Sequence, residues 1–257
     1  MRILQWGLIL PLLFTSQMAL SNSKSDEWQY LLVFPMIWAP SITGTTGPAG
    51  DKVNIDIPFD NIVDNLHFGL MGDFYAQKNK WLFGIRANYL HVKNDSSTQA
   101  GILVPSFNIA LDAQMSLNDA FGGYEVTKGL VLLSGVRHTY SNIKVDVAPN
   151  SDRPFWNDKS GTIVAKGHQF DWLIGLKYQH RFNEDWGISL TVDTSVVGDN
   201  DVNRGINLAG TYRLSKLNNI WFGYRYLNIQ NTTDSNKGPV EVDVTQKGPM
   251  LGWAFSF

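Results

Sequence analysis

Apolar and polar side chains alternate with a period of two along most of this chain, from Trp28 to the last residue. In the segment 81–89, Trp, Phe, Ile, Ala and Tyr occupy every second position, and Arg86 and Asn88 lie between them. Successive side chains of a β-strand point to opposite faces, whereas a helix repeats its apolar positions every three or four residues. The pattern therefore predicts an all-β fold built from strands with one apolar and one polar face.

About ten segments show this alternation, and turn-forming residues separate them. They are residues 28–38, 66–76, 81–92, 107–125, 130–147, 167–181, 186–197, 203–214, 219–231 and 241–257. An even number of strands lets an antiparallel barrel close with both termini on one side. The count is the weakest part of this prediction, because segments 107–125 and 130–147 are long and residues 51–57 also alternate. An eight-stranded barrel is the alternative.

The connections between these segments alternate between short and long. The short ones are residues 77–80, 127–129, 183–185 and 215–218, and the mostly longer ones are residues 39–65, 93–106, 148–166, 198–202 and 232–240. Short periplasmic turns and long outer loops are typical of outer-membrane barrels. We therefore expect an antiparallel transmembrane β-barrel in a bacterial outer membrane.

Composition excludes several other classes of protein. Charged residues make up 17% of the chain, below the roughly 25% of soluble domains, while aromatic residues reach 12%. The mean hydropathy is slightly negative, which excludes a protein of many membrane helices. The chain has no Cys, so disulfides and thiolate metal sites are excluded, and its net charge of -2 gives no surface for nucleic acid. A soluble β-sandwich or lipocalin-like barrel is the structural alternative.

The N-terminus has the features of a cleavable secretory signal. Arg2 supplies a positive charge, residues 6–14 form an apolar core, and Ala19-Leu20-Ser21 fits a small-x-small cleavage site. We expect residues 1–21 to be the signal peptide and residues 22–257 to be the barrel. A membrane-anchoring helix is the alternative, but the apolar run is shorter than the ~20 residues of a membrane span.

Charged residues within the predicted strands indicate which face meets the lumen. A Lys or Arg on the lipid face near the bilayer midplane costs about 2–4 kcal/mol, so these side chains should point inward. The residues expected to line the lumen are Arg86, Arg137, Lys177, Arg213, Arg225, Asp73, Asp112, Asp171 and Asp193. Opposite charges in one lumen predict ion pairs, which either hold the barrel together or line a narrow passage.

The last seven residues, 251–257, alternate and end in Phe257. This ending resembles the closing strand of Gram-negative outer-membrane proteins, and the resemblance implies that the barrel-assembly machinery recognises Phe257. Val242 and Val244 begin the same strand on the opposite parity, which predicts a bulge at Gly248-Pro249.

Further segments resemble a family of uncharacterised Gram-negative outer-membrane β-barrel proteins. They are residues 44–50, the Ile57-Pro58-Phe59 and Asp64-Asn65-Leu66 parts of 53–66, Gly135-Val136-Arg137, Gly223-Tyr224-Arg225-Tyr226, and the Gly248-Pro249-Met250-Leu251-Gly252 ending that leads to Phe257. The resemblance covers nearly all of the chain after the signal. It implies a barrel fold and an outer-membrane location, without an activity.

The segment 51–66 departs from the simple pattern of strands and loops. Phe59, Ile62, Val63 and Leu66 have helical spacing, and Pro58 suits the first helical position. We expect a short amphipathic helix that either constricts the barrel mouth or forms a surface lid with no gating role.

The five histidines test for catalysis of the kind found in omptin-like proteases or lipid A-modifying barrels. Parity predicts that His67 points inward and that His91, His138, His168 and His180 point outward. An acid–base histidine must reach both its partner and the substrate proton, which opposite faces prevent. We therefore expect no catalytic activity, no cofactor and no metal site.

The sequence thus predicts an integral outer-membrane barrel with a structural role or a narrow small-solute passage. Its expected partners are outer-membrane lipid, lipopolysaccharide and the assembly machinery that binds the C-terminal strand, and nucleic acid is not expected. A barrel hydrolase and a surface adhesion or receptor barrel are the alternatives. The sequence names no solute, ligand, surface partner or oligomeric state.

Overall fold

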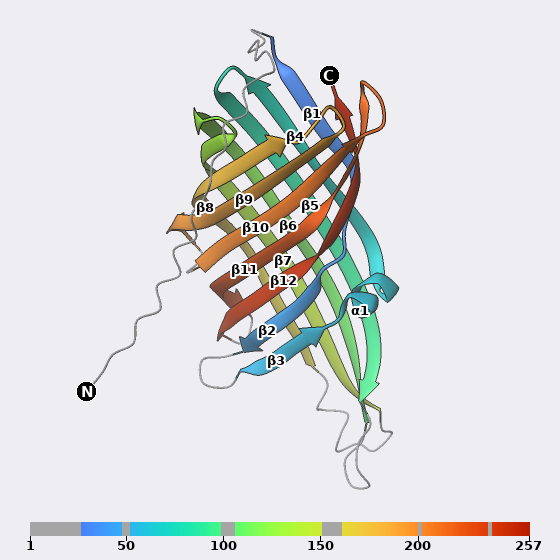
Figure 1. The fold of residues 1–257 in the computed structure, drawn as a ribbon. Coiled ribbons are helices and arrows are strands. Elements are labelled where there is room, and N and C mark those ends of the chain that lie inside the picture. Colours follow the sequence, from blue (N-terminus) through green and yellow to red (C-terminus); the bar gives the residue numbers. More distant parts are fainter. Residues whose placement is uncertain (1–26, 48–51, 99–105, 151–160, 200–201, 236–237) are drawn as a thin grey trace, which may run out of the picture.

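The protein is a closed antiparallel β-barrel of ten strands (Figure 1). The computed structural model describes residues 27–47, 52–98, 106–150, 161–199, 202–235 and 238–257, so the predicted signal peptide lies outside the described residues. The barrel strands are β1 (Gln29–Trp38), β4 (Leu66–Lys78), β5 (Trp81–Thr98), β6 (Ser106–Thr127), β7 (Leu130–Asn150), β8 (Gly161–Arg181), β9 (Trp186–Gly198), β10 (Val202–Arg213), β11 (Asn218–Ser235) and β12 (Gly238–Ser256). The predicted all-β class and the count of ten are confirmed.

Three further elements lie between β1 and β4. They are β2 (Ser41–Gly47), β3 (Val53–Ile57) and the helix α1 (Phe59–Asp64). Alternation at 51–57 pointed to β3, but 41–47 was wrongly placed in a loop. Its Gly and Thr residues carry almost no apolar alternation, and pairing with β12 makes it a strand. No helix among the described residues is long and apolar enough to cross a membrane.

The barrel closes where its first and last strands meet. β1 pairs with β12, and the backbones of Tyr30 and Phe257 exchange two hydrogen bonds of 2.7 and 3.0 Å. Their rings stack with centroids 5.4 Å apart. An even strand number places both ends of the barrel sheet on the same side, as expected. The role of Phe257 in assembly remains a prediction.

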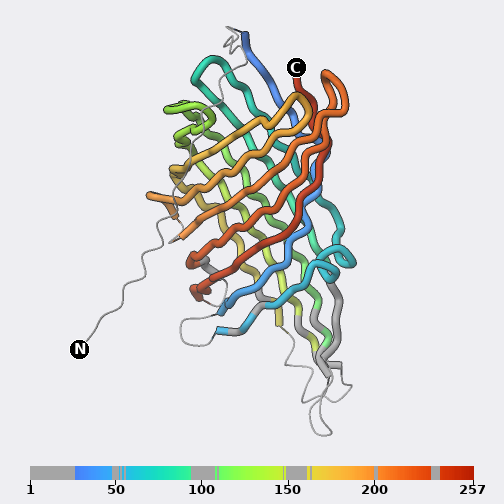
Figure 2. Tube along the Cα trace, viewed as in Figure 1, coloured from blue at the N-terminus to red at the C-terminus, as the bar shows by residue number. Residues whose placement is uncertain are grey.

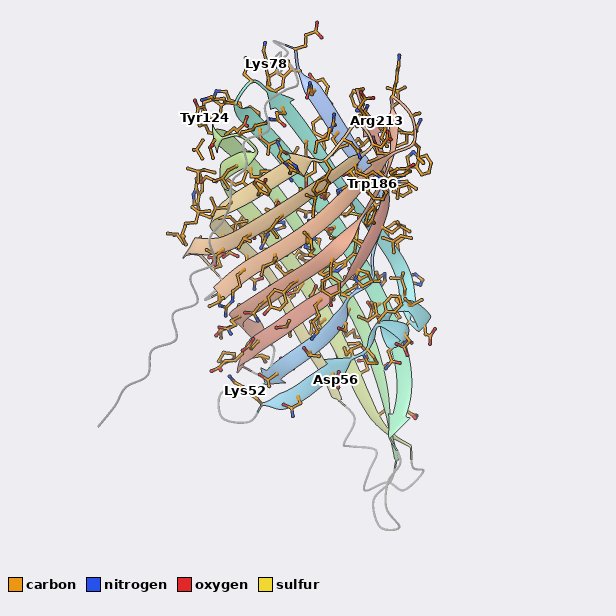
Figure 3. The ribbon with its side chains drawn as sticks, in the orientation of Figure 1. Lys52, Asp56, Lys78, Tyr124, Trp186 and Arg213 are labelled. Carbon is orange, nitrogen blue, oxygen red and sulfur yellow. The ribbon has the colours of Figure 1, made fainter. Side chains whose placement is uncertain are left out.

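We call the side of the barrel with these two ends and the short turns the turn end, and the opposite side the loop end. Figure 3 labels Lys78, Tyr124, Trp186 and Arg213 at the turn end and Lys52 and Asp56 toward the loop end. The trace in Figure 2 shows that β5, β6 and β7 continue toward the loop end beyond the hairpin of β9 and β10. At this level β8 pairs directly with β11 through Ala165 and Ser235.

The face that carries the apolar side chains changes part-way along the long strands. On β6, Asp119 faces the lumen in the turn-end half, whereas Leu117 and Ala113 face it farther toward the loop end. Gln114 and Asp112 then lie on the outer face. The turn-end half is therefore apolar outside and charged inside, as lipid contact requires, while the loop-end half has the opposite pattern.

The outward-facing side chains mark the level of this change on the other long strands. Near it, polar outward-facing residues follow the apolar ones: His91 on β5, His138 and Asn142 on β7, His168 and Lys166 on β8, Asn228 on β11 and Lys247 on β12. On the turn-end side of that level, large apolar side chains such as Ile85, Ile174 and Leu251 are exposed on the outer face. An exposed apolar band of this kind is typical of a lipid-contacting surface.

β12 makes this change without the predicted bulge. Its register with β11 is continuous from Asn218 to Ser235, so Val242 and Val244 simply face inward in the loop-end half. The irregularity lies on the partner strand, because the pairing of β1 with β12 shifts between Val33 and Met36. The bulge at Gly248-Pro249 was therefore wrongly predicted, since the change of apolar face needs no extra residue.

Gly248 is required where β1 bends into β2. A Cβ atom at this position would overlap the backbone carbonyl oxygen of Ala39. We expect Gly248→Ala to lower the free energy of unfolding by about 1–3 kcal/mol, because the backbone must shift to accommodate the methyl group. Urea unfolding of the purified barrel in detergent measures this change.

Gly69→Ala is the matched control on β4. The nearest atom to a Cβ there is Cδ1 of Leu66, at 3.6 Å, which is an ordinary contact. Its stability should be unchanged or raised by about 0.4–1 kcal/mol through a less flexible unfolded chain. Equal losses of stability in both variants would contradict the special role of Gly248.

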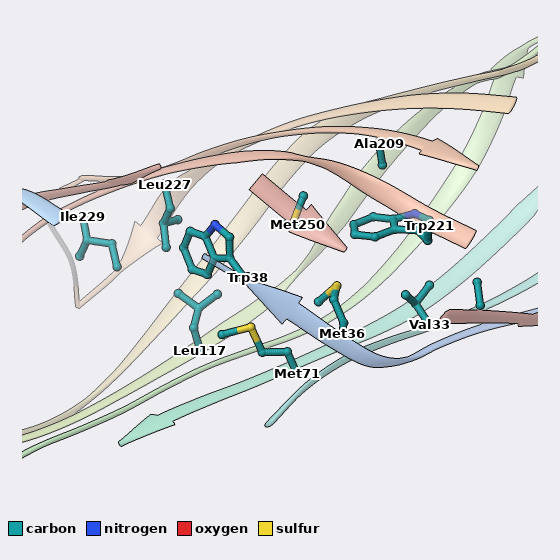
Figure 4. Close-up of a cluster of buried hydrophobic side chains, with 11 residues drawn as sticks. Val33, Met36, Trp38, Met71, Leu117, Ala209, Trp221, Leu227, Ile229 and Met250 are labelled. Carbon is teal, nitrogen blue, oxygen red and sulfur yellow. The ribbon is translucent and has the colours of Figure 1, made fainter. Parts of the chain in front are cut away.

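A cluster of apolar side chains fills one side of the lumen (Figure 4). Its members come from strands that are far apart in the sequence: Val33, Met36, Trp38, Met71, Leu117, Ala209, Trp221, Leu227, Ile229, Met250 and Ala254. Trp38 points inward and is nearly buried. These contacts join β1, β4, β6, β10, β11 and β12 across the barrel.

Candidate functional site

Eight of the nine predicted lumen residues do face the lumen. Seven of them are buried: Asp73, Arg86, Arg137, Asp171, Lys177, Asp193 and Arg225. Arg213 lies on the inward parity of β10 at the turn end, where it is half-buried. Asp112 is the exception. Buried charges need partners, so the arrangement of these groups decides what the lumen can do.

Asp119 holds two arginines at the centre of the network. Its Oδ1 accepts a 2.7 Å hydrogen bond from Nε of Arg137, and its Oδ2 accepts a 3.1 Å bond from Nη2 of the same residue. Nε of Arg86 lies 3.0 Å from Oδ2 of Asp119. All three side chains are almost completely buried. Two charged hydrogen bonds to one carboxylate fix the guanidinium of Arg137 in place.

A second carboxylate links the same arginines to the opposite wall. Asp193 on β9 lies 3.0 Å from Nη2 of Arg137 and 3.4 Å from Nη2 of Arg86. Nη1 of Arg137 donates a 2.6 Å hydrogen bond to Asn203 on β10, and Asn203 donates one of 2.9 Å to Asp171 on β8. Side chains from six consecutive strands, β5 to β10, therefore meet near the barrel axis.

Further contacts cross the lumen nearer to the turn end and on its other side. Gln179 on β8 donates a 3.3 Å hydrogen bond to Gln77 on β4, and the Lys177 ammonium lies 4.8 Å from the ring centroid of Tyr75. Arg225 on β11 reaches Asn88 on β5, 3.5 Å away. Because opposite walls touch through their side chains at successive levels, the turn-end half is filled rather than open.

The lumen charges balance one another. Arg86, Arg137, Lys177 and Arg225 are matched by Asp73, Asp119, Asp171 and Asp193 among the buried residues of the described chain. Rings of a single sign of charge select ions in pores. A balanced, interlocked set has no such sign and resembles the ionic core of a protein interior.

Asp119 was missed and Asp112 was placed on the wrong face for one reason. The apolar residues of β6 from Leu111 to Leu117 share one parity, which sequence reasoning assigned to lipid. That parity faces the lumen, so Asp119 lies inside and Asp112 outside. The available signal was Ala120, Gly122 and Tyr124, which put non-polar residues on the other parity near the turn end.

Asp112 forms an outer-face cluster in the loop-end half. Nε2 of His91 lies 2.9 Å from its Oδ1, and Nζ of Lys93 lies 3.4 Å from its Oδ2. Slight desolvation raises the pKa of Asp112, but the His91 hydrogen bond and the Lys93 charge outweigh this and hold it below its usual value. The cluster is partly exposed, so its effect on stability is small.

The histidines do not converge on a catalytic arrangement. His67 was expected inside, but a bulge between Leu66 and Phe68 leaves it exposed, with its ring 4.9 Å from that of His91. His138 and His168 form a separate outer-face pair, with Nε2 and Nδ1 3.2 Å apart. No group of three or more His, Asp or Glu side chains in the described ranges is arranged to hold a metal.

The helix predicted after Pro58 is present as α1, with Pro58 as its N-cap residue. It connects β3 to β4 at the flank of the barrel (Figure 1), and Ile62 is its buried residue. This position at the flank differs from the predicted alternative in which the helix constricts the barrel mouth.

Comparison with known proteins supports the fold alone. No protein-family model and no curated protein matches the chain. The outer-membrane protease OmpT of Escherichia coli has 12% identity and a TM-score of 0.53, covering 93% of this chain and 99% of OmpT. The translocator domain of the autotransporter NalP of Neisseria meningitidis has 11% identity and a TM-score of 0.47, covering 91% and 90%. The toluene transporter TodX of Pseudomonas putida has 10% identity and a TM-score of 0.37, covering 90% of each chain.

At such low identity, the likeness to OmpT shows that this chain has the outer-membrane β-barrel fold. A shared fold carries no activity with it, because function depends on the residues of the site.

Proposed function

We propose that this protein is an integral outer-membrane barrel with a closed lumen and a structural role, rather than a general porin. The observation that carries this proposal is the buried network of Arg86, Asp119, Arg137 and Asp193, which links β5 to β9 across the lumen. A ten-stranded barrel is narrow, so these side chains are sufficient to occupy its interior. The exposed apolar band of the turn-end half supports the outer-membrane location.

Absence of catalysis is part of the same proposal. The histidines described above lie on the outer face, while the buried carboxylates of Asp119, Asp171 and Asp193 are held by arginines or asparagines and that of Asp73 accepts a hydrogen bond from Tyr75. An acid–base catalyst needs a titratable group that a substrate can approach. This arrangement provides ionic cohesion instead.

Conductance across a planar lipid bilayer tests the closed lumen. The wild-type barrel should insert without steady, stepwise currents, and so should Tyr224→Ala, which alters only an outward-facing side chain of β11. Arg225→Ala on the neighbouring inward position removes the contact with Asn88. It should give brief, small currents if this contact helps to block the lumen. Steady open-channel currents from the wild type would overturn the proposal in favour of a solute passage.

A further inference from the structure

The inner wall of the loop-end half is mostly apolar. Inward-facing, half-buried side chains occur on strands around this part of the barrel: Leu90 and Val92 on β5, Leu111 and Met115 on β6, Ile143 and Val145 on β7, and Val242 and Val244 on β12. Ala113 and Ile42 on the same wall are buried. We call this set the loop-end chamber lining.

The exposure and polarity of this lining differ from those of the charged network. Its members are mostly half-buried, whereas the side chains of the Asp119 network are almost fully buried. The described inward-facing residues at this level include Gln169 and Asn231 but no charged side chain. An accessible apolar interior without charge favours an apolar occupant over an ion or a sugar.

The floor and the width of the chamber are set by elements already described. The apolar cluster around Trp38, Leu117 and Ile229 borders the chamber on its turn-end side, and Val244 packs against this cluster. At this level β8 meets β11 directly, so β9 and β10 no longer widen the wall. A barrel of about eight strands holds its own side chains or one small ligand. The space therefore suits one narrow molecule.

One side of the chamber wall lacks a hydrogen-bonded ladder. β1 pairs with β4 only from Gln29 to Val33, and β4 has no ladder partner on that side from Leu66 to Gly72. β3 pairs with β2 alone, so its other edge is also free. Figure 1 shows α1 connecting these two edges. We call this break the β3–β4 seam.

Apolar side chains border the seam on its outer face. Phe68 and Leu70 on β4 and Phe59 and Val63 on α1 are exposed. They continue the apolar band of the turn-end half, where Ile85 and Tyr89 belong to the neighbouring strand β5. Open sheet edges are costly in hydrocarbon, so a break at this position requires a specific role.

We propose that the loop-end chamber binds one single-chain hydrocarbon, such as the tail of a long-chain fatty acid, which enters from the outer leaflet through the β3–β4 seam. The uncharged lining selects an apolar chain, the narrow wall admits one chain, and the seam joins the chamber to the lipid-facing band. The proposal rests on the closed lumen only for the chamber floor, and conductance measurements test that floor separately.

Photolabelling in nanodiscs tests the proposal. Folded barrel is exposed to palmitic acid that carries a mid-chain diazirine, and labelled residues are mapped by mass spectrometry. We expect labels on Val242 and Val244 of the wild type. Met115→Lys should reduce them about tenfold or more, because a hydrocarbon chain would desolvate the new charge. Gln114→Lys, one residue away on the outer face, should leave them unchanged.

Two additions keep the result interpretable. Ala113→Phe fills the same space without a charge and should reduce labelling in the same way, even if Met115→Lys fails to fold. In a second arm, the diazirine is carried by a phospholipid of the nanodisc. Labelling of Val242 and Val244 by the phospholipid alone would overturn the single-chain assignment. Labels confined to the outer face of the turn-end half, insensitive to Met115→Lys and Ala113→Phe, would overturn the chamber itself.

Discussion

Replacing Asp119 with alanine should lower the free energy of unfolding of the barrel by about 3–5 kcal/mol. The substitution removes the only carboxylate that gives Arg137 two hydrogen bonds, and it leaves Arg86 with the 3.4 Å contact to Asp193. Both guanidinium groups stay buried, so neither can recover its interactions with water. Urea titration in detergent, followed by tryptophan fluorescence, gives the change directly.

Asp112→Ala provides the control on the same strand. Its carboxylate contacts His91 and Lys93 on a partly exposed surface, where ion pairs contribute less than about 1 kcal/mol. A loss of stability in Asp112→Ala as large as that in Asp119→Ala would mean that β6 is turned the other way. The double variant Asp119→Ala, Arg137→Ala should recover part of the loss, because it removes one of the two buried cations that lose the Asp119 carboxylate.

The sequence was sufficient for the barrel and most of its strands because alternation is a local property. Trp81 to Tyr89 shows the pattern without reference to any other strand. β2 was missed for the complementary reason: its Ile42 is flanked by Ser, Thr and Gly, and only its pairing with Lys247 to Glu241 defines it as a strand. Strands that are specified by their partners cannot be recognised from their own residues.

The sequence predicted most of the charged residues of the lumen network, but it did not predict which of these residues contact one another. The cost of charge in lipid placed Arg86 and Arg137 inside, and this inference was correct. Asp119 was not among the predicted lumen residues, because Leu111 to Leu117 look like a lipid-facing series. That reasoning assumes one environment along the whole strand, whereas the outward face of β6 changes from non-polar residues near the turn end to polar residues toward the loop end.

This reversal can be tested on the outer surface. Ile174→Lys on β8 places a charge in the exposed apolar band of the turn-end half. It should destabilise the barrel in lipid by about 2–4 kcal/mol. Asn142→Lys on β7 also faces outward but lies in the loop-end half, so its free energy of unfolding should change by less than about 0.5 kcal/mol.

Unfolding both variants in phospholipid vesicles and again in water-soluble polymer separates the effect of lipid from that of packing. The loss of stability in Ile174→Lys should be smaller in the polymer, because the cost arises from moving the ammonium out of water and the polymer covers the band with less hydrocarbon than a bilayer. If Asn142→Lys lost as much stability as Ile174→Lys in vesicles, lipid would have to cover both halves. The apolar lining of the loop-end half would then have no aqueous exterior to explain it, since a strand in hydrocarbon gains nothing by turning its apolar side chains inward.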